Sequence, residues 1–129
     1  MSLDVEISVS LSVDDREIVD EILSVANKEP LAWQELMVFK KRGVSVYRLR
    51  RIILALLAKG ELIELKCRLF VTKELLEKTP PKKLREMIVE KIRRLGLRKC
   101  GKPIGVPCEK ISISITRNGT IIVNVPNTL

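Results

Sequence analysis

With 129 residues, 46% of them hydrophobic and 31% charged, the chain is long enough for one folded domain with a buried core. Its longest apolar run, residues 52–58, is far shorter than the roughly 20 residues of a membrane span, and acids at positions 4 and 6 are unlike the basic start of a signal peptide, so we expect a cytoplasmic protein with no membrane partner. The formal net charge is +8 and histidine, the commonest general base and metal ligand, is absent, which favours a protein that binds a polyanion over an enzyme.

Positive charge is concentrated after the first quarter of the chain. Residues 1–35 have a net charge of −7, whereas residues 36–129 have a net charge of +15. Between Leu36 and Gly60 there are seven bases and no acid. A surface of one sign attracts polyanions and speeds their capture, so the place of these bases on the predicted elements bears directly on function.

The first two predicted elements are a strand and a helix. Apolar residues alternate with polar ones over residues 4–11, which is the period of a half-buried strand. Ser12 precedes Asp15 by three residues, a spacing typical of a capped helix start, and this helix should end near Asn27, ahead of Pro30. Its predicted core stripe is Ile18, Ile22, Val25 and Ala26, with Val19 and Leu23 alongside.

Two further helices follow, separated by a glycine. Pro30 suits the first turn of the second helix because its missing N–H costs nothing there, and Gly43 should end that helix. Ser45 can cap the third helix, and Gly60 fits the position just after its last turn. The expected buried faces are Trp33, Leu36, Met37 and Lys40 on the second helix, and Val46, Leu49, Ile53, Leu56 and Leu57 on the third.

A short hairpin is predicted directly after the third helix. Its strands are residues 61–65 and 69–72, with a three-residue tip between them. Thr72 should cap one or two helical turns, and a longer helix over residues 82–95 should end at Gly96. The apolar side of the longer helix holds Leu84, Met87, Ile88, Ile92 and Leu95.

A basic loop, residues 98–107, and a second hairpin complete the predicted elements. A three-residue turn with Gly119 in the left-handed conformation gives the hairpin one wholly apolar face, whereas a two-residue turn would mix the two faces. The expected pairs are Ile115 with Ile121, Ile113 with Val123 and Ile111 with Val125. The similar alternation in residues 4–11 predicts that this strand joins the hairpin in a small sheet, within one chain or between two.

Two stretches near the middle of the chain carry a family resemblance. Leu56–Ile63 passes from a basic helix through a glycine into a strand, and Leu69–Thr72 leads out of the hairpin into a Thr-capped helix. On these grounds residues 12–78 resemble the winged helix-turn-helix DNA-binding superfamily, especially small archaeal and bacterial regulators. The resemblance implies an α+β fold with the third helix as recognition helix and the following hairpin as wing. Residues 79–129 would then form a C-terminal extension of helix, basic loop and hairpin.

The exposed side of the third helix is the predicted nucleic-acid site. Once the apolar stripe is buried, Tyr47, Arg48 and Arg51 should share an outward face in the first half of the helix, where a recognition helix contacts base edges. Arg suits a bidentate contact with guanine, the bases before Gly43 would sit on phosphates, and the hairpin tip could reach the minor groove or the backbone. The predicted nucleic-acid-binding residues are Lys40, Lys41, Arg42, Ser45, Tyr47, Arg48, Arg50, Arg51, Lys66 and Arg68.

The three cysteines allow a disulfide or free thiols and disfavour a metal site. Cys100 and Cys108 bracket a seven-residue stretch, and Cys67 lies at the predicted hairpin tip. Three thiols without histidine leave a four-ligand zinc site one ligand short. The lysine- and glutamate-rich composition resembles that of hyperthermophilic proteins, in which intracellular disulfides occur. We therefore expect either a Cys100–Cys108 disulfide or free structural thiols, and no metal.

The sequence favours a binding protein over an enzyme. It has no Gly-rich phosphate loop, no nucleophile with a base partner and no recognisable carboxylate cluster, and we expect no cofactor. The leading hypothesis is a nucleoid-associated transcriptional regulator or chromatin-associated factor that binds double-stranded DNA through residues 45–59, as a homodimer with its two reading helices one DNA turn apart.

Two other functions remain open. The first is a winged-helix adaptor in a transcription, replication or division complex, which the acidic first helix and the apolar-faced C-terminal hairpin favour. The second is RNA binding, which is disfavoured because few residues could stack on bases and most of these suit the core. The aromatic residues in question are Trp33, Phe39, Tyr47 and Phe70.

Overall fold

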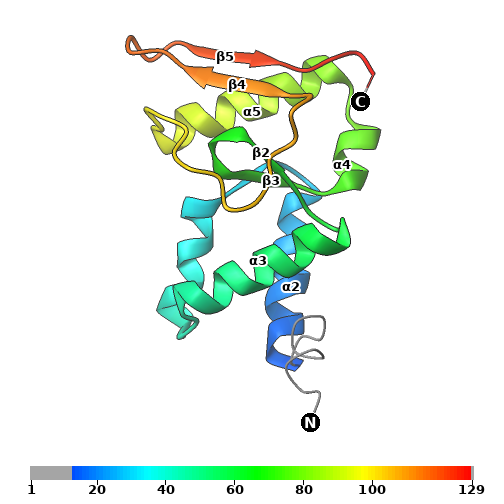
Figure 1. Ribbon diagram of the computed structural model, residues 1–129, viewed down its shortest axis with the longest axis vertical. Coiled ribbons are helices and arrows are strands. Elements are labelled where there is room, and N and C mark those ends of the chain that lie inside the picture. The colour runs from blue at the N-terminus through cyan, green and yellow to red at the C-terminus, as the bar shows by residue number, and fades with distance from the viewer. Residues whose placement is uncertain (1–12, 129) are drawn as a thin grey trace.

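The computed structural model describes residues 13–128 and has a mixed helix-and-sheet, α+β, fold (Figure 1), as the sequence predicts. The elements in chain order are α2 (Val13–Ala26), β1 (Leu31–Ala32), the 3₁₀ helix η1 (Trp33–Arg42), α3 (Val46–Lys59), β2 (Ile63–Leu65), the 3₁₀ turn η2 (Lys66–Arg68), β3 (Leu69–Val71), α4 (Lys73–Lys78), α5 (Pro81–Leu95), β4 (Ser112–Ile115) and β5 (Ile121–Asn124). The strand expected over residues 4–11, its pairing with the C-terminal hairpin and the cap at Ser12 lie outside the described residues.

Helices α2, η1 and α3 pack around the first of two apolar cores. The ends of α3 follow local sequence signals: the Ser45 hydroxyl accepts a hydrogen bond from the Arg48 backbone N–H at 3.1 Å, and Gly60 ends the helix with a φ of 75°. Val25 and Val46, which were expected in the core, lie in the terminal turns of their helices and stay exposed. The central core residues of the three helices include Ile18, Ile22, Ala26, Leu36, Leu49, Ile52, Ile53 and Leu56.

The second predicted helix differs from expectation in its type. Helix η1 is a 3₁₀ helix, which has three residues per turn and aligns side chains at every third position. Its buried positions are therefore Leu36 and Phe39, with Trp33 half-buried on the same face. Lys40, which a 3.6-residue period would place near that face, is exposed.

A two-residue strand, β1, replaces the expected first turn of that helix. Pro30 is buried before β1 and does not open the helix, which starts at Trp33. In β1, Leu31 pairs with Phe70 and Ala32 pairs with Leu69. Strand β1 therefore pairs with the edge of β3 opposite to β2. This pairing between distant segments overrides the local helix signal at Pro30.

Helix α5 lies between the two sheets (Figure 1). One sheet has the strand order β1-β3-β2 and the other is the antiparallel β4–β5 hairpin. Leu84, Ile88 and Ile92 of α5 are fully buried in a second core, to which residues of both sheets contribute. In the view of Figure 1, α3 lies at the end of the molecule away from the β4–β5 hairpin, so the C-terminal elements extend the fold on the side opposite α3.

The C-terminal hairpin has the expected register. Ile113 pairs with Val123 and Ile115 with Ile121, and Gly119 has a φ of 85° in the three-residue turn. The Thr116 backbone N–H donates to the Thr120 carbonyl at 2.9 Å and closes the turn. The alternation of isoleucine and serine therefore fixes which face of the hairpin packs on α5.

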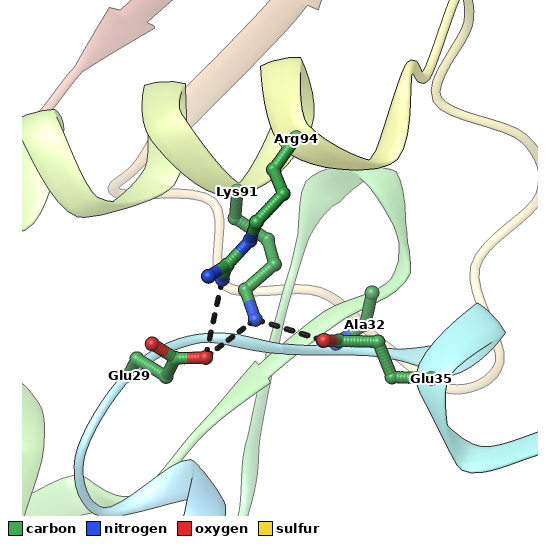
Figure 2. A network of polar contacts seen from close by, with 5 residues as sticks. All are labelled: Glu29, Ala32, Glu35, Lys91 and Arg94. Carbon is green, nitrogen blue, oxygen red and sulfur yellow. Dashed lines mark hydrogen bonds and ion pairs between the residues drawn. The ribbon is translucent and has the colours of Figure 1, made fainter. Parts of the chain in front are cut away.

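A buried lysine joins α5 to the junction between α2 and η1 (Figure 2). The side chain of Lys91 is only 1% exposed, and its Nζ donates to Glu29 at 2.7 Å and to Glu35 at 2.9 and 3.0 Å. Arg94 also donates to Glu29, and the Ala32 backbone N–H donates to Glu35. The hydrogen bond from Lys91 holds the pKa of Glu29 below its usual value. A charge this deeply buried requires such partners, and here they fix α5 against the junction between α2 and η1.

Candidate nucleic-acid interface

The outer face of α3 exposes an aromatic side chain and arginines in the first half of the helix. Tyr47 is 77% exposed, and Arg50 and Arg51 are also exposed. Among the ion pairs of residues 13–128, none involves Arg50, and Arg51 reaches Asp15 only at 3.9 Å. Three of the predicted site residues on this helix thus point to solvent together, whereas Ser45 serves as the helix cap.

Arg48 does not face outward as expected. Its Nε donates to Oδ1 of Asp15 on α2 at 2.6 Å, and its Nη2 lies 2.6 Å from the same oxygen. The Asp15 side chain is 4% exposed and that of Arg48 is 30% exposed. A buried carboxylate needs charged hydrogen-bond donors, so the packing of α2 beside the start of α3 turns Arg48 inward.

All three bases at the end of η1 are exposed, and one of them, Arg42, forms an ion pair. Arg42 donates from both Nη atoms to Glu21 of α2, at 2.8 and 3.0 Å, and its guanidinium lies over the Phe39 ring at 5.1 Å from the centroid. The hydrogen bond from Arg42 holds the pKa of Glu21 below its usual value. Lys40 and Lys41 are exposed beside this pair. Acids of α2 thus pair with three of the arginines predicted to contact nucleic acid: closely with Arg42 and Arg48, and at 3.9 Å with Arg51.

The hairpin after α3 is short at its tip. Only the three residues of η2 join β2 to β3, and two of them, Cys67 and Arg68, have left-handed φ values of 65° and 55°. Lys66 is exposed. Arg68 is half-buried, and its Nε donates to the Lys102 backbone carbonyl. Of the two bases predicted at this tip, only Lys66 extends freely into solvent.

The basic loop, residues 98–107, folds across this hairpin together with the following Cys108. Cys100 forms a disulfide with Cys67 of η2, and Cys108 is free. This differs from both expected alternatives, a Cys100–Cys108 bond or free thiols throughout: Cys100 lies against η2, while the Cys108 backbone N–H donates to the Glu64 carbonyl of β2 at 2.7 Å. The loop therefore spans the hairpin and does not close on itself.

Glu64 is a functional candidate that sequence reasoning missed. It lies in β2 between two apolar residues, where an acid usually faces solvent, but it is only 1% exposed. Its carboxylate accepts hydrogen bonds from the backbone N–H groups of Ile104, at 2.8 Å, and Gly105, at 2.6 Å. No local sequence signal indicates this contact, because Glu64 and Gly105 are 41 positions apart in the chain.

The described residues contain no group of three or more Cys, Asp and Glu side chains placed to hold a metal ion. Nor does any helix within residues 13–128 have the length and apolar character to cross a lipid bilayer. Comparison with known proteins finds no protein-family model, curated protein or solved structure that matches the chain.

Proposed function

We propose that the protein binds double-stranded DNA, as a transcriptional regulator or chromatin-associated factor, and that α2 to α4 act as a winged helix-turn-helix. The proposal is supported by the order helix, strand, helix, helix, hairpin, with η1 and α3 joined through Gly43, and by the sheet order β1-β3-β2. In this assignment α3 is the recognition helix and the β2–β3 hairpin is the wing.

The observation that carries the proposal is the group of exposed side chains on the first half of α3. The major groove, about 12 Å wide, admits an α-helix, and a recognition helix contacts base edges with its N-terminal residues. Tyr47, Arg50 and Arg51 occupy that part of α3 and are exposed. Arg50 and Arg51 are suited to bidentate contacts with guanine; Arg51 keeps the role that the sequence suggested for it, and Arg50 replaces Arg48.

Exposed lysines around α3 suit the phosphate backbone. Lys40 and Lys41 precede α3, Lys59 lies in its last turn, and Lys66 extends from η2. Lysine and arginine contacts to phosphate position a protein on the duplex without reading sequence. Each such contact releases counterions, so DNA affinity should fall steeply as salt increases.

The test is a gel-shift titration on a 25-base-pair duplex. The double variant Arg50→Ala/Arg51→Ala should lower affinity by at least tenfold, because each bidentate base contact contributes about 1–3 kcal/mol. The matched control is Lys82→Ala/Lys83→Ala, which removes the same charge from exposed positions at the start of α5. If the two double variants bind equally well, α3 is not the recognition helix.

An adaptor function is the second candidate, because α3 also exposes apolar side chains. Leu54 is 41% exposed in the middle of α3, and Val46 is exposed at its start. Apolar side chains at such positions suit a protein partner more than a phosphate backbone. The salt dependence of binding distinguishes the two functions, because docking through an apolar patch lacks the steep loss of affinity that counterion release produces.

A further inference from the structure

The basic loop is attached to the β2–β3 hairpin at several points along its backbone. Cys100 is joined to Cys67 by the disulfide, and the Lys102 carbonyl accepts a hydrogen bond from the Arg68 side chain. The N–H groups of Ile104 and Gly105 donate to the Glu64 carboxylate. The Cys108 N–H adds a further hydrogen bond to the backbone of β2. Because most of these bonds engage the loop's main chain, its basic side chains remain outside the attachment.

The exposed side chains of the loop carry charge of one sign. Arg98, Lys99 and Lys102 are exposed, and the stretch from Lys91 to Cys108 contains no acid. Lys66 adds an exposed base from η2, to which the loop is bonded. The acid to which the loop is bonded, Glu64, is buried and accepts hydrogen bonds from backbone N–H groups of the loop.

The loop also lies against α3. Ile104 packs on the core formed by α2, η1 and α3, and a Cβ at Gly105 would lie 3.0 Å from Leu57 and 3.8 Å from Leu54. Three residues of chain span at most about 11 Å, so the backbone of Lys102 is within that distance of Gly105. In Figure 1 the loop leaves α5 and dips towards α3 before it rises into β4.

We infer that the basic loop acts as a second wing that binds the DNA phosphate backbone beside α3. This inference rests on the proposed DNA-binding function. The hairpin tip itself is three residues long and exposes Lys66 alone, so it offers little charge to a neighbouring phosphate. The loop supplies the missing bases at Arg98, Lys99 and Lys102. The attachment through Glu64 holds them at a fixed position relative to α3, which reduces the entropy lost on binding.

The experiment measures the affinity of the full chain for a fluorescent 25-base-pair duplex by anisotropy, at several salt concentrations. The variant Lys99→Ala/Lys102→Ala removes two exposed charges and leaves every attachment point of the loop in place. We expect affinity to fall on the order of tenfold near physiological salt, and the slope of log K against log salt to decrease in magnitude by about 1.8, or about 0.9 for each phosphate that the variant no longer neutralises. The control is again Lys82→Ala/Lys83→Ala, whose slope should match that of the wild-type protein.

A second variant, Glu64→Gln, distinguishes the effect of the loop's attachment on DNA affinity from the effect of net charge. It raises the net charge by one, so an effect of charge alone would strengthen DNA binding. A glutamine can accept from one of the two loop N–H groups through its oxygen but presents an NH₂ to the other. If the loop must be held in place, Glu64→Gln weakens binding despite its extra positive charge. Stronger binding by Glu64→Gln would contradict the role of the attachment.

The outcomes distinguish the loop from the recognition helix. Loss of affinity in both Lys99→Ala/Lys102→Ala and Arg50→Ala/Arg51→Ala supports the second wing. If only the Arg50→Ala/Arg51→Ala variant loses affinity, the loop is not a wing, and the proposed function stands. If both variants bind as well as the wild-type protein, or if the wild-type protein does not bind DNA at all, both proposals are wrong.

Discussion

Acidic side chains act in opposite ways on the two sides of the proposed interface. On the side of α2, Asp15 and Glu21 bond to the guanidinium groups of Arg48 and Arg42 and reduce the positive charge available to a ligand. On the side of the basic loop, the bonds that Glu64 makes within residues 13–128 go to backbone N–H groups and to none of the exposed lysines. The charge that a surface presents therefore depends on whether its acids bond to side chains or to the main chain. The net charge of the sequence does not report this difference.

Removing the disulfide should give the largest loss of stability. The change is made on the side of the basic loop and leaves the ion pairs of α2 in place. The Cys67–Cys100 bond joins residues 33 positions apart. Closing a chain of this length stabilises the folded state by about 3–4 kcal/mol in the chain-entropy estimate. We expect Cys67→Ala/Cys100→Ala to lower the free energy of unfolding by up to that amount in urea titrations, and to weaken DNA binding by loosening the loop.

The control for the disulfide is Cys108→Ala, which removes the free thiol. This variant should unfold at nearly the same urea concentration as the wild-type protein, and a reductant should destabilise both to a similar extent. Insensitivity of the wild-type protein to reductant would mean that the loop is held by its hydrogen bonds alone.

A comparison of Arg48→Ala with Arg50→Ala tests whether the acids of α2 remove Arg48 from the DNA-binding surface. Arg48→Ala removes the charged hydrogen bond to the buried Asp15 carboxylate, a change that should cost about 3 kcal/mol of stability, while DNA affinity should fall less than about threefold. Arg50→Ala removes an exposed side chain, so stability should change by about 0.5 kcal/mol or less, while DNA affinity falls about tenfold. The measurements are urea unfolding and the gel shift on the same two variants. The reverse pattern would mean that Arg48 leaves Asp15 to bind DNA.

Local signals were sufficient to predict most elements of the fold. The cap at Ser45, the stop at Gly60 and the turn at Gly119 each depend on residues within a few positions of one another. Period and turn chemistry therefore predicted the helices and the register of the hairpin. They failed at β1 and at the type of η1, where pairing with β3 and a three-residue period replaced the expected helix.

The features that decide the character of the site are long-range. Arg48 and Asp15 are 33 positions apart, Glu64 and Gly105 are 41 positions apart, and Lys91 bonds to a residue 62 positions away. No periodicity within one element encodes these partners, because they depend on which elements pack together. The sequence therefore gives a set of candidate bases, but it does not show which of them form ion pairs in the fold.

The smallest expected effect concerns the exposed pair of Glu21 and Arg42 on the side of α2. Because Arg42 lowers the pKa of Glu21 below its usual value of 4.5, the pair stabilises the fold at pH values above about 4.5. This contribution is lost as the pH falls through the lowered pKa of the folded state. Glu21→Gln should therefore be slightly less stable than the wild-type protein at pH 6, and the difference should be smaller at pH 3. Urea midpoints measured between these two values test this expectation.

The matched control for Glu21 is Glu61→Gln, which removes an exposed acid outside the ion pairs of residues 13–128. The same variants also serve in the DNA-binding assay, because Glu21→Gln frees Arg42 from its partner. If α2 reduces the charge of the interface through specific pairing, Glu21→Gln should strengthen DNA binding more than Glu61→Gln does. Equal gains would show that these acids act only through net charge, and the contrast between the two sides of the interface would then rest on Asp15 and Glu64 alone.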